Sequence, residues 1–191
     1  MRWDALFADL QAQLDAAQTA EFDAAVAEAA RLESSRLELA DRLRAHQGQQ
    51  LSLVLPGNRR LAVRVGAVGS DWLSGTLTQH SVLVPLSALR AVDGMQRSAA
   101  RAEASVTRRR LGIMEPIRRL SRDRSVVQVH GGEGLLAQGL IAGAGRDFLE
   151  IVEFTAGEPH RGSAASSAAR RTLPLHSVCW LQSEEQGSEP G

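Results

Sequence analysis

An internal repeat constrains this sequence more than any other feature. The segment Gly69–Leu73 returns as Gly145–Leu149, and Val84–Leu89 returns as Leu173–Val178. The alternating aliphatic residues that precede the first motif also return in register, at an offset of 76 residues. A repeat of this size is typical of one small supersecondary unit used twice. The sequence therefore predicts two related β-barrel-like modules in one chain.

Alternation of apolar and polar residues predicts short strands in each copy. In the first copy we expect strands at 51–55, 61–65, 72–78, 82–84 and 89–92, with turns at Pro56–Asn58 and after Pro85. The second copy begins at Val127 and is longer by 13 residues, which fall in the Gly/Ser/Ala-rich stretch 157–169. Such a composition is typical of an extended loop.

The first 47 residues predict helix, because neither Gly nor Pro occurs from Trp3 to Ala45 and strong helix formers dominate. Apolar residues between Trp3 and Ala17 recur at spacings of three and four, whereas those from Phe22 onward are out of phase with them. We therefore expect one broken helix or a helical hairpin, with the break near Gln18–Glu21. Gly48 is expected just past the helical end.

These patterns predict an α+β fold, in which a helical region precedes two small, five-stranded, strongly bent antiparallel units. The expected boundaries are 1–47 for the helical region, 48–94 for the first β unit, 95–124 for a connector with a short helix near 115–121, and 125–182 for the second β unit. Residues 183–191 are polar and acidic, and we expect them to be a disordered tail.

The formal net charge is zero, but the charges are unevenly distributed. Residues 1–47 hold nine acids and five arginines, whereas residues 95–124 hold nine arginines and three acids. All 22 basic residues are arginine. This is a compositional bias, and it weakens the argument that arginine was selected for its phosphate-matching geometry.

A helix followed by five bent strands, with Gly-containing turns and Pro in the fourth strand, resembles the Sm-like family of SH3-like barrels. The matching runs are Gly132–Gly139 and Asp147–Leu149 in the second copy, and Gly57 and Leu61–Leu73 in the first. The similarity covers roughly residues 42–92 and 118–181. It implies two Sm-like barrels in tandem. The opening Met1–Phe7 also resembles a group of actinobacterial proteins with no established activity.

RNA-binding members of the Sm-like family carry a Met-Asn pair before the third strand and an Arg-Gly pair in the fourth-to-fifth turn. Here the first place holds Asp71-Trp72 or Asp147-Phe148. The second place holds Leu86–Ala88 or Leu175–Ser177. Neither signature is present, so the resemblance implies the scaffold and not the family's RNA pocket.

Two sets of residues are candidates for binding a partner. A basic set could contact the phosphates of RNA, or could instead be a solvated connector or one docked on the acidic helices; it comprises Arg108, Arg109, Arg110, Arg118 and Arg119. An apolar set on the N-terminal helical region could form a seam with a protein partner or a second copy of the chain; it comprises Trp3, Phe7, Leu10 and Leu14.

No residue pattern points to catalysis. We expect Asp71 and Asp147 to bond backbone amides and Trp72 and Phe148 to pack in a core or an interface. The five histidines lack metal-ligand spacing with each other or with Cys179, which we expect to be a buried thiol. Neither a phosphate-binding Gly loop nor a nucleophile motif is present. The sequence therefore predicts no enzyme, metal, cofactor or small-molecule substrate.

Two functional hypotheses remain. In the first, a non-catalytic tandem Sm-like module contacts RNA, or a protein bound to RNA, through its basic connector. In the second, the chain is a protein-interaction or assembly scaffold that uses its N-terminal helices. We expect a cytoplasmic protein without a membrane partner, because the sequence has no apolar run of spanning length and no secretory signal.

Overall fold

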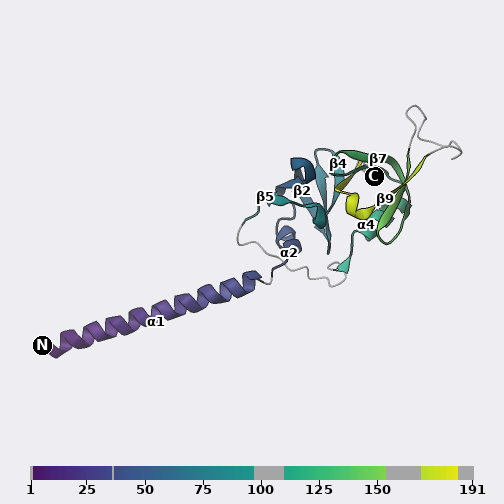
Figure 1. Ribbon diagram of the computed structural model, residues 1–191. Coiled ribbons are helices and arrows are strands. Elements are labelled where there is room, and N and C mark those ends of the chain that lie inside the picture. The colour runs from purple at the N-terminus through teal and green to yellow at the C-terminus, as the bar shows by residue number, and fades with distance from the viewer. Residues whose placement is uncertain (1, 36, 97–109, 154–168, 185–191) are drawn as a thin grey trace, which may run out of the picture. The chain divides into compact units, whose positions relative to one another are not determined.

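The computed structural model describes residues 2–35, 37–96, 110–153 and 169–184 (Figure 1). It divides into two units, Met1–Glu38 and Leu39–Gly191. Arg108 and Arg109 lie outside the described residues, as do the stretch 157–168 of the expected loop and residues 185–191 of the expected tail.

The first unit is one helix, α1, which spans Arg2–Ser35 and is 34 residues long. It continues without interruption through Gln18–Glu21, so a hairpin turn at that place is wrong. The change of apolar phase does not disturb the backbone, because an Ala-rich stretch without Gly or Pro keeps its helical hydrogen bonds whichever face is apolar. The next helix, α2, begins only at Leu39.

The short helix α2 (Leu39–Arg44) belongs to the second unit. It buries Ala40 and Leu43 in the first hydrophobic core. Gly48 follows with a φ of 81°, the left-handed conformation expected of a residue just past a helix end. The compact β-containing unit therefore begins at Leu39 rather than at residue 48.

The strands of the first half lie where the alternation predicts them. They are β1 (Gln50–Leu55), β2 (Arg59–Val68), β3 (Trp72–Leu77), β4 (His80–Pro85) and β5 (Ala91–Asp93), with single 3-10 turns η1 (Pro56–Asn58) and η2 (Leu86–Ala88). Strands β1 to β4 form three consecutive antiparallel pairs, β1 with β2, β2 with β3 and β3 with β4, and β5 returns to pair with β1.

The second half repeats this arrangement. Its elements are α4 (Met114–Arg122), β6 (Val126–His130), β7 (Leu135–Ala144), β8 (Phe148–Glu153), β9 (Arg170–Pro174), η3 (Leu175–Ser177) and β10 (Trp180–Glu184). Strand β10 includes Ser183 and Glu184, which were expected in the disordered tail. They are ordered because they pair with Ser81 and His80 of β4, a contact that local composition does not reveal.

All ten strands form one antiparallel sheet in the order β5-β1-β2-β3-β4-β10-β6-β7-β8-β9. Both halves thus have the same internal order, with β10 holding in the second half the place that β5 holds in the first. The halves are joined where β4 pairs with β10, with Leu83 opposite Leu181. Among the described strands the sheet is not closed, since β5 and β9 each have one neighbour.

Hydrogen bonds confirm the repeat in detail. The amide of Leu86 donates to Asp71 O at 2.8 Å, and the amide of Leu175 donates to Asp147 O at 2.7 Å. Gly69 N donates to Trp72 O, and Gly145 N to Phe148 O, both at 2.9 Å. The two copies therefore share the same turn before the third strand and the same turn after the fourth.

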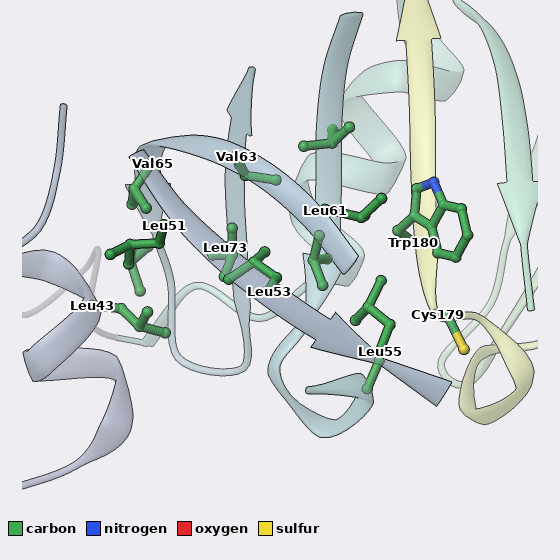
Figure 2. Packing of buried hydrophobic residues seen from close by; sticks show 14 of the residues in the cluster. Leu43, Leu51, Leu53, Leu55, Leu61, Val63, Val65, Leu73, Cys179 and Trp180 are labelled. Carbon is green, nitrogen blue, oxygen red and sulfur yellow. The ribbon is translucent and has the colours of Figure 1, made fainter. Parts of the chain in front are cut away.

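The β unit has two hydrophobic cores, one in each half of the repeat, and each core includes side chains from the other half. The first core contains the inward residues of β1 and β2 together with Trp180 of β10 and Cys179, which directly precedes that strand. Figure 2 shows both of these side chains with Leu55 and Leu61 at one end of that core. The second core contains the inward residues of β6 to β8 together with Trp72 and Leu83 from the first half. The two halves thus exchange side chains across the joint.

Two polar side chains are buried beside the first core. Arg44 is 3% exposed and donates to Asp41 Oδ1 at 2.6 Å and to Gly69 O at 2.7 Å. His46 is fully buried; its Nε2 accepts from Gln96 N at 2.8 Å, so its Nδ1 donates to Arg42 O. These contacts tie α2 and the segment after β5 to the sheet.

Candidate interaction surfaces

The described members of the basic set lie on or just before α4. Arg110 is exposed. Arg118 pairs with Glu115 of the same helix at 3.6 Å, and Arg119 pairs with Asp123, the residue just after the helix, at 3.7 Å. Such exposed pairs contribute at most about 1 kcal/mol, but they partly neutralise the surface charge. Both predicted basic residues on α4 are thus paired with nearby acids.

The apolar set lies on α1. Trp3 is part of the helix, and the side chains of Phe7, Leu10 and Leu14 are exposed, Phe7 by 63%. Phe22, Val26 and Leu32 farther along α1 are exposed as well. Residues 2–35 also contain seven acids and two arginines. The helix therefore presents large apolar side chains within a strongly acidic surface.

The turn before β3, residues Gly69–Trp72, binds the connector. The carbonyl oxygen of Leu111 accepts hydrogen bonds from Ser70 N (3.1 Å), Ser70 Oγ (3.1 Å) and Trp72 Nε1 (2.9 Å). Asp71 Oδ1 accepts from Ile113 N at 2.8 Å. Asp71 thus bonds a backbone amide as predicted, and we call these four residues the occupied turn.

The turn before β8, residues Gly145–Phe148, is its repeat equivalent, and we call it the open turn. In both turns the aromatic ring lies against the glycine, so that a Cβ on either glycine would overlap it. Trp72 is 9% exposed, whereas Phe148 is 37% exposed and Asp147 is exposed. Within the described part of the chain no segment docks here. Of the two expected environments, core or interface, Trp72 therefore has the core, whereas for Phe148 packing in an interface stays a prediction.

A cluster of Arg59, His130 and Trp180 lies where the two halves of the β unit meet. The rings of His130 and Trp180 stack at 4.2 Å with an interplanar angle of 6°, and the Arg59 guanidinium lies 5.3 Å from the Trp180 ring centre. Burial, followed by the charge of Arg59, lowers the pKa of His130 below its ordinary value. His130 and Trp180 lie opposite each other on neighbouring strands. Burial in this stack, together with the charge of Arg59, therefore favours a neutral imidazole on His130.

Acidification should weaken the folded state through His130. Its folded pKa lies below 6.5, the value of an unperturbed histidine, so between these two values the unfolded chain binds more protons. The contribution is complete above about pH 6.5 and is lost as pH falls through the folded pKa.

Urea titrations at a series of pH values test this expectation. His130→Phe keeps a ring on Trp180 but cannot titrate, so its free energy of unfolding should depend less on pH between 7 and 5 than that of the unaltered chain. Equal pH slopes for the two proteins would contradict the assignment.

A small pocket lies beside the paired strands β4 and β10. Its volume is about 180 Å³, and its walls are mainly apolar. It is lined by Ser74, Ser81, Val82, Leu83, Pro116, Arg119, Leu120, Asp123, Val127, Leu181 and Ser183. The charged residues here, Arg119 and Asp123, already pair with each other.

The described residues contain no cluster of three histidine, cysteine or acidic side chains that fits a metal ion. Cys179 is buried, and desolvation raises the pKa of its thiol, which keeps it protonated near neutrality. None of the helices in the described ranges is long and apolar enough to cross a bilayer.

Comparison with known proteins yields no family model, no curated protein and no solved structure that matches this chain.

Proposed function

We propose that this chain is a non-catalytic protein-interaction scaffold built from two Sm-like barrels in tandem, with α1 as its partner-binding element. The barrel assignment is supported by the strand order, in which the fifth strand of each half lies beside the first. It is also supported by the Pro-containing fourth strand and the 3-10 turn that follows it in each half.

The exposed apolar residues of α1 carry the scaffold proposal. Large exposed apolar side chains mark protein contacts, and a long helix in water is stabilised mainly by packing one face against a partner. Because α1 has an excess of five acids over arginines, two copies of α1 would repel each other. A partner surface that is both apolar and basic fits α1 better than a second copy does.

RNA binding is the second candidate. Residues 110–124 include five exposed arginines and only two acids, and this excess would attract phosphates by counterion release. Its weakness is that Arg118 and Arg119 are already paired with Glu115 and Asp123. A basic surface of this kind predicts weak, salt-sensitive binding without base recognition.

Affinity purification of the full chain tests the scaffold proposal. Replacing Leu10 and Leu14 by alanine should remove a defined protein partner, whereas Gln11 and Gln18, exposed polar residues of the same helix, should tolerate alanine without loss. Alanine keeps helix propensity, so the two double variants differ mainly in apolar contact.

The same preparations distinguish RNA binding. An unchanged set of partners in both double variants, together with single-stranded RNA affinity that falls when Arg118 and Arg119 become alanine, would replace the scaffold by the RNA hypothesis. The salt dependence of that affinity would then become shallower, because fewer counterions are released.

A further inference from the structure

The repeat gives the open turn a template for its ligand. In the occupied turn, a carbonyl oxygen and an amide two residues apart, Leu111 O and Ile113 N, meet the turn backbone and the Asp71 carboxylate. The side chain of Ile113 is buried beside Trp72 in the second core. The occupied turn therefore binds the residues just before α4, where Ile113 already has helical dihedral angles, through two backbone groups and one apolar side chain.

The open turn keeps most of the groups that do this. Its backbone has the same internal hydrogen bonds, which place Arg146 N where Ser70 N lies and Asp147 where Asp71 lies. Phe148 replaces Trp72, so the ring remains while the indole N–H donor is lost. Among the described residues, neither Asp147 nor the partly exposed ring of Phe148 meets a segment like the connector.

We propose that the open turn, Gly145–Phe148, docks a short peptide segment of a partner protein, in the conformation that Leu111–Ile113 has in the occupied turn. The segment offers a carbonyl to Arg146 N, an amide two residues later to the Asp147 carboxylate, and an apolar side chain to the ring of Phe148. This site is separate from α1 and stands independently of the function proposed for that helix.

The chemistry of the site selects among occupants. The central group of the site, the Asp147 carboxylate, takes an N–H donor, whereas phosphate groups offer only acceptors, which disfavours RNA. A second copy of the chain is disfavoured too, because the Leu111–Ile113 segment of each copy already occupies its own first turn. The remaining occupant is an apolar segment from a different protein.

A peptide with the sequence of residues 110–116, Arg-Leu-Gly-Ile-Met-Glu-Pro, is the probe. Added to the ¹⁵N-labelled full chain, it should shift the amide signals of Arg146, Asp147 and Phe148 in a saturable way. The signals of Ser70–Trp72 should stay in place, because the tethered connector competes at a high effective concentration. The same peptide methylated on the isoleucine nitrogen cannot donate to Asp147, and it should not bind.

Protein variants test the same contacts. Asp147→Asn should weaken peptide binding about tenfold or more, as expected for losing a charged acceptor, whereas Glu133→Gln, an exposed acid of the same unit, should leave it unchanged. Phe148→Ala should weaken binding, and Leu135→Ala, an exposed apolar residue of β7, should not. Thermal melting confirms that each variant is folded; if Phe148→Ala is not, the methylated peptide and Asp147→Asn still decide.

Four results would overturn the proposal. They are the absence of saturable shifts at millimolar peptide, equal binding of the methylated peptide, shifts of the open turn caused by a single-stranded RNA oligonucleotide, and shifts caused by raising the concentration of the chain alone. The third would make the turn an RNA site, and the fourth a contact between copies.

Discussion

Replacing Trp180 by alanine is expected to lower the free energy of unfolding by about 3–5 kcal/mol. The indole is 3% exposed, belongs to the first core, and stacks on His130. Because Trp180 belongs to β10, the last strand of the second half, a loss of hydrogen-exchange protection in β1 and β2 would show that the first half depends on it. Chemical denaturation and hydrogen exchange measure the two effects.

Leu135→Ala is the control for this prediction, since Leu135 is 55% exposed in the same unit and its truncation should cost about 0.5 kcal/mol or less. If Trp180→Ala were as mild as Leu135→Ala, or if it affected only β6 to β10, the exchange of side chains between the cores would be incorrect.

Arg44→Ala is the second substitution with a large expected effect, about 3–5 kcal/mol of stability. The guanidinium is buried, pairs with Asp41, and donates to Gly69 O in the segment between β2 and β3. Alanine leaves the largely buried Asp41 carboxylate without this cation and the Gly69 carbonyl without this donor, and removing one partner of a buried ion pair costs more than the pair contributes.

Arg60→Ala provides the matched comparison. Arg60 also pairs with an aspartate, Asp93, but both side chains are more than half exposed, and the loss should be at most about 1 kcal/mol. Both changes remove an arginine from an Arg–Asp pair of the same unit. The difference between their losses of unfolding free energy in urea titrations therefore measures the effect of burial. Equal losses for the two variants would contradict the buried role of Arg44.

Local patterns predicted most of the strands because each uses a simple alternation. Leu51, Leu53 and Leu55 point to one side of β1, and the structure buries all three. The repeat extended this prediction to the second half, where turns before β8 and after β9 match those of the first in their hydrogen bonds. Short-range patterning and duplication were thus enough to place these elements.

The joint between the halves could not be predicted in this way. The residues around Leu181 contain no pattern that predicts pairing with Leu83. Pairing between residues so far apart in the sequence depends on which sheet edges are free after each half has folded. The different burial of Trp72 and Phe148 could not be predicted from local patterns either. They occupy equivalent positions, but among the residues that the structure describes, a core and a connector cover Trp72 alone.

The candidate interaction residues were predicted less completely than the strands. The exposure of Phe7, Leu10 and Leu14 agrees with an apolar seam on the N-terminal helix. The basic surface was predicted from the number of arginines alone, but Glu115 and Asp123 lie one helical turn away from Arg118 and Arg119 and pair with them. The burial of Arg44 could not be predicted locally, because it depends on the distant turn at Gly69.

The joint between β4 and β10 also sets an order of events during translation. The ribosome releases β1 to β4 well before it releases β10, so the nascent first half waits with an unpaired strand edge and an unfilled place for Trp180. Exposed edges of this kind invite wrong partners or chaperones. The part of the β unit that is synthesised first is therefore completed last.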